Sequence, residues 1–89
     1  MDESVIEEQH ARNQKALVEL LQTDLDVAMA MLRTAELASS AEHRKSALEK
    51  VRRALQAVRT FQGKIEDPKL WTIIHRRTDE LAATLESFG

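Results

Sequence analysis

The chain has 89 residues, enough for one domain, and its 13 basic and 15 acidic residues give a net charge of −2. It contains no cysteine, 2 glycines and 1 proline, which excludes disulfides and thiolate metal sites. The abundance of Ala, Leu, Glu, Lys and Arg favours helices, and the 3% of aromatic residues leaves little material for a strand-rich core. We therefore predict an all-α fold.

The first 15 residues are mostly polar and hold few sizeable aliphatic side chains. We predict that residues 1–15 form an arm, helical or frayed, outside a bundle domain of residues 16–89. The N-terminus lacks the basic-then-apolar pattern of a secretory signal. The longest apolar run, residues 27–32, is far shorter than the ~20 residues that cross a membrane. The sequence predicts a cytoplasmic protein with no membrane partner.

Residues 16–38 are predicted to form the first core helix, because apolar side chains recur there at heptad-like spacing. One line contains Leu17, Leu21, Leu25, Ala28, Leu32 and Ala35. Beside it lie Leu20, Val27, Met31 and Ala38, while Ala30 and Leu37 point away from the main line. This apolar arc is wider than one partner helix can cover, so we expect two neighbours and some apolar surface left over.

A second helix is predicted over residues 40–62. Ser39 followed by Glu42 is typical of a capping box at its start. Only one or two residues separate this helix from the first, so the two should run antiparallel as a hairpin. Its apolar stripe is narrower and contains Ala47, Val51, Ala54, Leu55, Val58 and Phe61.

A third helix is predicted over residues 68–88. Gly63 can take the positive φ of a helix C-cap, and Asp67 before Pro68 has the pattern of an N-cap followed by proline at N1. The apolar face of this helix comprises Leu70, Ile74, Leu81, Leu85 and Phe88, flanked by Trp71 and Ile73. Three helices of similar length predict an antiparallel up-down-up three-helix bundle. An ordered arm would add a short fourth helix or extend the first one.

Charged side chains interrupt these apolar faces, and a charge in such a place is costly unless it is paired. Arg77 lies on the face of the third helix, Arg44 on that of the second, and Asp24 at the edge of the first. We predict two structural ion pairs that specify the register of the helices, Asp24–Arg77 and Glu36–Arg44. An Arg77 that faces a ligand is the alternative.

The second helix is basic, and Lys45, Arg52 and Arg59 recur every seven residues along one flank. In an antiparallel hairpin Arg52 would face Asp26 and Arg59 would face Glu19, which predicts charge compensation within the chain. The other interpretation is a patch for an acidic partner. Aromatic side chains do not alternate with these bases, so we expect no nucleic-acid partner.

No constellation of residues predicts catalysis. Glu7 with His10, and His75 with Asp79, have the spacing of metal ligands on a helix, but neither pair is accompanied by further ligands. There is no glycine-rich phosphate loop, and Ser39 has no base placed to activate it. We expect no enzyme activity, no metal and no cofactor.

The sequence therefore favours a small interaction or self-assembly module. We expect a homodimer that covers the spare surface of the first helix, alone or together with the third. The residues expected to carry interactions are Leu20, Val27, Ala30, Met31, Leu37, Lys45, Arg52 and Arg59. One alternative is a regulatory adaptor that receives a partner's amphipathic helix in a groove between two of its own. Another is small-molecule binding in a core cavity beside Ala28, Ala35, Ala47 and Ala54.

Overall fold

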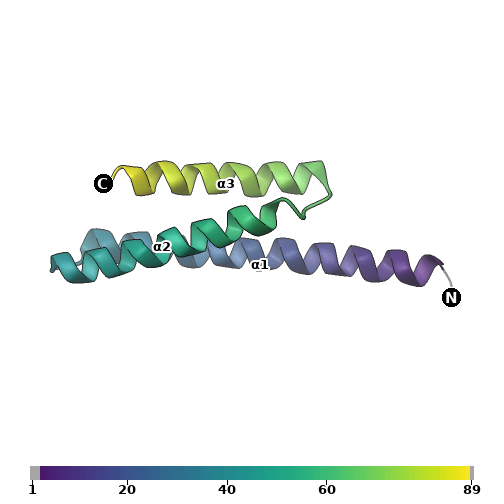
Figure 1. Cartoon of the computed structure of the whole chain (residues 1–89), viewed down its shortest axis with the longest axis horizontal. Helices are drawn as coiled ribbons and strands as arrows, with labels where there is room; N and C mark the ends of the chain where they lie inside the picture. The colour runs from purple at the N-terminus through teal and green to yellow at the C-terminus, as the bar shows by residue number, and fades with distance from the viewer. Residues whose placement is uncertain (1–2, 89) are drawn as a thin grey trace.

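A computed structural model describes residues 3–88. This part of the chain forms three helices and no strand: α1 (Glu3–Leu37), α2 (Ala41–Gln62) and α3 (Pro68–Glu86). Each helix contacts the other two, and α2 runs back along α1 before α3 reverses the direction again (Figure 1). The predicted all-α, up-down-up three-helix bundle is confirmed. Met1 and Asp2, which were assigned to the arm, lie outside the described residues.

The first helix is longer than its neighbours because nothing in its sequence stops it. Residues 3–37 contain neither proline nor glycine, and α1 runs through all 35 of them without a break. At 1.5 Å per residue this is about 52 Å, close to the longest dimension of the molecule, 58 Å. The described part of the predicted arm is thus the start of α1, which projects beyond α2 and α3 (Figure 1). Of the two alternatives for an ordered arm, the extended first helix is confirmed.

The cap of α2 differs from the prediction by one residue. Ser40, whose backbone is extended (φ −124°, ψ 150°), is the N-cap, and its hydroxyl accepts a hydrogen bond from the His43 N–H at 3.2 Å. Ser39 was the predicted cap, and that prediction is wrong. Because the helix starts at Ala41, Glu42 is its second residue and not its third, so the reciprocal capping box does not form.

The connection from α2 to α3 keeps a right-handed backbone. Gly63 has φ −62°, so the predicted positive φ is wrong. The N–H groups of Lys64 and Ile65 bond three residues back, to Phe61 and Gln62, and so extend the end of α2 by a tight turn. The start of α3 follows the prediction: the Asp67 carboxylate accepts from the Lys69 N–H at 2.8 Å, and proline occupies the first turn.

The core lies along the middle of the bundle and contains the main predicted apolar line of each helix, while Leu20 and Val27 of the second line on α1 are exposed. Its largest fully buried apolar side chains are Leu21, Leu25, Val51, Val58 and Ile74. Two details differ from the prediction: Phe61 is exposed, with Lys64 5.1 Å from its ring centre, and the buried position beside it belongs to Gln62. Leu48 and Ile65 are buried although neither was assigned to a stripe.

The three helices are not packed equally. α1 contacts α2 more extensively than α3, and buried alanines on both sides of that contact, Ala28, Ala35 and Ala47, allow the two helices to approach closely. The second half of α1 is left with a groove on its α3 side and with an uncovered face pointing away from the bundle. None of the helices in residues 3–88 has an apolar stretch long enough to cross a membrane.

Candidate interaction surfaces

The face of α1 that points away from the bundle carries an unbroken line of uncharged side chains, which we call the outer seam. Its members alternate at spacings of three and four residues, the pattern of a helix that packs against another helix. They are Ile6, Gln9, Asn13, Ala16, Leu20, Thr23, Val27, Ala30, Thr34 and Leu37, and all ten are exposed. The seam lies on the opposite side of α1 from the core residues Leu21, Leu25 and Leu32.

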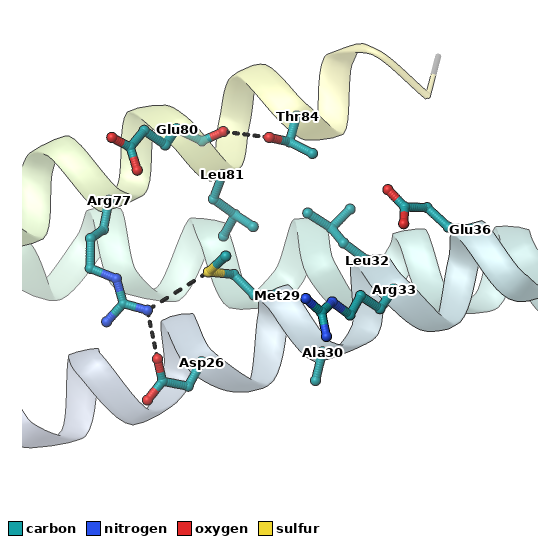
Figure 2. Close-up of a pocket in the computed structure, with 10 residues that line it drawn as sticks. All are labelled: Asp26, Met29, Ala30, Leu32, Arg33, Glu36, Arg77, Glu80, Leu81 and Thr84. Atoms are coloured by element: carbon teal, nitrogen blue, oxygen red, sulfur yellow. Dashed lines mark hydrogen bonds and ion pairs between the residues drawn. The ribbon is translucent and has the colours of Figure 1, made fainter.

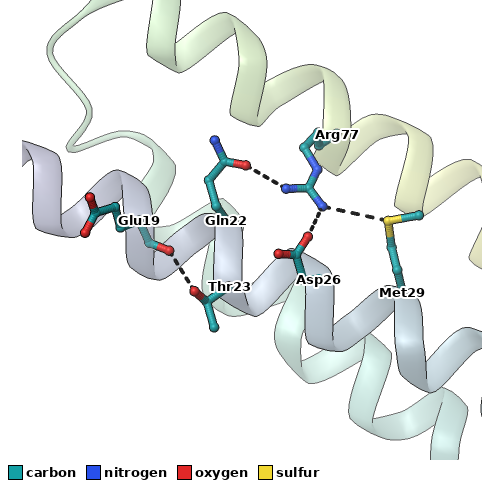
Figure 3. A network of polar contacts seen from close by, with 6 residues as sticks. All are labelled: Glu19, Gln22, Thr23, Asp26, Met29 and Arg77. Atoms are coloured by element: carbon teal, nitrogen blue, oxygen red, sulfur yellow. Dashed lines mark hydrogen bonds and ion pairs between the residues drawn. The ribbon is translucent and has the colours of Figure 1, made fainter.

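The apolar part of the seam is concentrated between residues 16 and 37. Leu20 and Val27 are more than half exposed and Leu37 is 84% exposed. The two threonines in this part contribute less polarity than their type suggests, because their hydroxyls donate back to the helix: Thr23 to the Glu19 carbonyl at 3.0 Å (Figure 3) and Thr34 to the Ala30 carbonyl at 3.1 Å. Because its hydroxyl proton is already used within the helix, each threonine offers a methyl group and no free hydrogen-bond donor to a helix packed against the seam.

Sequence reasoning found four of the seam residues, Leu20, Val27, Ala30 and Leu37, but treated them as two separate groups. Met31, the fifth apolar candidate on this helix, is half-buried and packs against the core at the edge of the seam. Ala16, Thr23 and Thr34, which complete the seam between residues 16 and 37, were missed. The signal that finds them is the seven-residue repeat 20, 27, 34 interleaved with 16, 23, 30, 37.

Charged side chains line the two edges of the seam. Glu19, Asp26 and Arg33 follow each other at seven-residue intervals on the edge nearer α3, and Asp24 lies on the opposite edge. This is the arrangement of flanking positions in a coiled coil, where such charges select the partner and its orientation.

Arg77 of α3 contacts residues of α1 along the seam edge nearer α3. Its guanidinium donates to the Gln22 side-chain oxygen at 2.7 Å and to Oδ1 of Asp26 at 2.6 Å, and it lies 3.8 Å from the sulfur of Met29 (Figure 3). Residues 22, 26 and 29 share one face of α1, because their spacing is close to one and two helical turns. Asp24 points to the other flank, so the predicted Asp24–Arg77 pair is wrong. Arg77 is nevertheless part of an ion pair between helices.

The second predicted ion pair, Glu36–Arg44, is also wrong. The guanidinium carbon of Arg44 lies 5.2 Å from the centre of the Phe88 ring, a cation–π contact that joins the start of α2 to the end of the chain. Glu36 lies on the other side of α1, where it borders the groove toward α3. The two side chains thus leave α1 and α2 in different directions.

The groove between α1 and α3 has a volume of about 650 Å³. Leu32 of α1 and Leu81 of α3 point toward each other at its floor, and Met29 lies beside them (Figure 2). The Arg77–Asp26 pair lies at one end, and acidic side chains lie along both walls, Glu36 on α1 and Glu80 on α3. The groove is open along its length and has the mixed lining of a shallow surface site.

The basic stripe of α2 does not lie against α1. Arg59 borders a hollow formed with Trp71, His75 and Asp79 of α3, and the arginine that pairs with Asp26 is Arg77 of α3. The predicted pairing of Arg52 with Asp26 and of Arg59 with Glu19 is therefore wrong. Lys45, Arg52 and Arg59 are all exposed, and within residues 4–88 none of them forms an ion pair.

The side chains of two histidines, His10 and His75, make polar contacts within the described part of the fold. His75 stacks on Trp71 with ring centres 4.5 Å apart, its Nδ1 lies 2.9 Å from the Gln62 amide, and its Nε2 lies 3.2 Å from the Asp79 carboxylate. A neutral ring with the proton on Nε2 satisfies both polar contacts. His10 pairs with Glu66 of the α2–α3 connection. Among the described residues no group of three or more His, Cys, Asp or Glu side chains is arranged to hold a metal ion.

No protein-family model, curated protein or solved structure matches the chain. Of the surfaces described, the outer seam is the longest and the only one of them without a charge along its centre.

Proposed function

We propose that this protein is a non-enzymatic self-assembly module that forms a homodimer through the outer seam of α1. The observation that carries the proposal is the exposed, uncharged line of ten side chains along a 35-residue helix. Because 31% of the chain is charged, about three charges would be expected in ten exposed positions. A line without any charge is typical of a surface that another helix covers.

The non-enzymatic part of the proposal is supported by what the polar side chains do. The groups that sequence reasoning considered as metal ligands are engaged within the chain, His75 with Gln62 and Asp79, and His10 with Glu66. The guanidinium of Arg77 donates hydrogen bonds to Asp26 and Gln22. Three of these contacts join separate parts of the fold: His75–Gln62 links α3 to α2, Arg77–Asp26 links α3 to α1, and His10–Glu66 links α1 to the α2–α3 connection. Joining parts of the fold is the role of structural polar groups.

The test is the mass of the protein in solution as a function of concentration. Sedimentation equilibrium at about 10 to 500 µM should give twice the chain mass at the upper end, and the melting temperature should rise with concentration. Val27→Glu should weaken the dimer at least about tenfold, because it would place an unpaired carboxylate in the covered seam. Val27 is 52% exposed in the single chain, so the helical content should not change.

Phe61→Glu is the matched control, since it replaces an exposed apolar side chain of α2, away from the seam, with the same charge. It should leave the dimer intact. A chain that stays monomeric at every concentration contradicts the proposal, and so does a Val27→Glu variant that dimerises as well as the control.

The groove between α1 and α3 supports a second candidate, an adaptor that receives the amphipathic helix of another protein. Its apolar floor, formed by Leu32 and Leu81, is the specific observation in favour. Met29→Glu shows whether a homodimer uses the groove in place of the seam, because Met29 is exposed and lines the groove but not the seam. Homodimerisation that survives Val27→Glu and is lost in Met29→Glu would assign the interface to the groove.

A further inference from the structure

The edges of the outer seam carry enough charge to decide how a second copy lies against it. The orientation of two packed helices decides which edges meet. In a parallel pair, the edge nearer α3 of one copy meets the opposite edge of the other copy. In an antiparallel pair, each edge meets the same edge of the other copy. The charged positions on the two edges of α1 are not equivalent, so the possible arrangements differ in the number of like charges brought together.

A parallel arrangement is unfavourable. It places Glu19 of one copy against Asp24 of the other, twice by symmetry, and Arg33 against the uncharged Ala38. It gains no pair of opposite charges along the seam from residue 16 to residue 37. Like charges across a helix contact destabilise it and select against that orientation.

An antiparallel arrangement has one register without such conflicts. When Leu20 faces Leu37 of the second copy and Val27 faces its Ala30, the edge nearer α3 brings Asp26 against Arg33 of the second copy, twice. Sliding the second copy by one heptad in one direction places Asp24 of one copy against Asp24 of the other. A shift in the other direction places Arg33 against Arg33 and shortens the overlap.

The structure leaves Asp26 free to accept this second arginine. Arg77 contacts Oδ1 of the carboxylate, and the Asp26 side chain is still 70% exposed. The Arg77 side chain is 26% exposed and approaches from the α3 side, leaving the outer side of Asp26 open. A carboxylate has acceptor capacity for both guanidinium groups.

Resting on the homodimer proposed above, we propose that the partner of the outer seam is a second copy of this chain laid antiparallel, with its two-fold axis between residues 28 and 29 of α1. Leu20 then packs on Leu37 of the second copy, Thr23 on Thr34, and Val27 on Ala30. Large side chains meet small ones at the centre, so the two α1 helices approach closely. The two bundles lie back to back, with α2 and α3 of each copy on the outside.

Engineered cysteines test the register, because the chain has none of its own. The variant carrying both Leu20→Cys and Leu37→Cys should form disulfide-linked dimers under mild oxidation. Each single variant should not, since the two copies of residue 20 would be about 25 Å apart along the helix and a disulfide requires Cα atoms within about 7 Å. In the paired variant the thiols meet at an effective concentration on the order of mM, against about 50 µM in bulk, so cross-linking should be at least about tenfold faster.

The outcomes separate this inference from the proposed function when the mass of each reduced variant is also measured. Rapid cross-linking of the single Leu20→Cys variant would show a parallel dimer and overturn the inference while the homodimer stands. A dimer that cross-links in none of the variants, including the conservative pair Thr23→Cys with Thr34→Cys, would overturn the inference and move the interface elsewhere. A monomer in every case would overturn both.

Arg33→Glu tests the charge argument independently. In the proposed register it places a carboxylate against Asp26 of the other copy twice, once on each side of the two-fold axis, and dimer dissociation should become roughly three- to tenfold more favourable. Arg53→Glu makes the same change of net charge on the exposed face of α2 and serves as the control. Equal dissociation constants for the two variants would overturn the register.

Discussion

Gln14 attaches the first half of α1 to the rest of the molecule. Its side-chain nitrogen donates to the Lys64 carbonyl at 3.0 Å, and its side-chain oxygen accepts from the Glu66 N–H at 2.9 Å. One amide group thus satisfies both a carbonyl and an N–H of the connection between α2 and α3. We predict that Gln14→Ala destabilises the fold by releasing this connection from α1.

The magnitude follows from the two hydrogen bonds. A hydrogen bond of this kind contributes about 1 kcal/mol net, because water replaces the lost partner in the unfolded chain. The connection is largely exposed, so water can also reach the freed backbone groups in the folded variant. The expected loss is about 1–2 kcal/mol in the free energy of unfolding, or about 4–16 °C in the melting temperature for a domain of this size.

The assay is urea unfolding followed by far-UV circular dichroism at one fixed protein concentration. Gln56→Ala is the control, because it makes the same change at an exposed position of α2 whose side chain forms no hydrogen bond within the described residues. The comparison cancels the gain in helix propensity that alanine brings to both variants. Amide exchange of Glu66 should also accelerate in Gln14→Ala and not in Gln56→Ala.

Two results would contradict the role given to Gln14. One is an unfolding free energy of Gln14→Ala within about 0.3 kcal/mol of the control, which is below the smallest net value expected for one hydrogen bond. The other is a loss of stability without any change in the exchange of Glu66, which would place the effect somewhere other than the connection.

Two further predictions concern polar side chains of α3. Arg77→Met should change the free energy of unfolding by no more than about 1 kcal/mol, because Asp26 is largely exposed and can be hydrated, while the new methionine keeps the contact with Met29. Chemical denaturation measures this change. A larger loss of stability would show that the Arg77–Asp26 pair is essential to the fold. Thr78→Val should leave the free energy of unfolding unchanged or raise it by about 0.5–1 kcal/mol, because the buried hydroxyl only donates to the Ile74 carbonyl of its own helix at 2.7 Å. A melting temperature below that of the native chain would contradict this expectation.

The apolar residues of each helix, and hence the core, were predictable from spacing. Leu21, Leu25, Val51 and Ile74 fall on lines that a 3.6-residue period defines, and burying those lines is what brings the helices together. The start of α3 was predictable for a different reason. An aspartate followed by proline satisfies the first amides of a helix locally, whatever the surroundings.

The partners of the charged side chains were not predictable in the same way. Asp24 and Asp26 differ by only about 3 Å in height along α1 but by about 200° in direction. Matching the heights of residues along the two helices therefore predicted Asp24 as the partner of Arg77. The face that α1 turns toward α3 carries Asp26, which is the actual partner. The sequence specifies the height of a residue along its helix, but the rotation of that helix relative to α3 depends on how all three pack.

Helix periodicity and caps are local properties of the chain, so the amino-acid sequence alone specifies three amphipathic helices and more apolar surface on α1 than one neighbour can cover. Which part of that surface stays uncovered depends on how the three helices pack. Placing α3 on one side of the α1–α2 hairpin set Arg77 on Asp26, directed Arg59 toward α3 and left the outer seam exposed. The side taken by α3 depends on long-range packing, and no short-range pattern in the sequence specifies it.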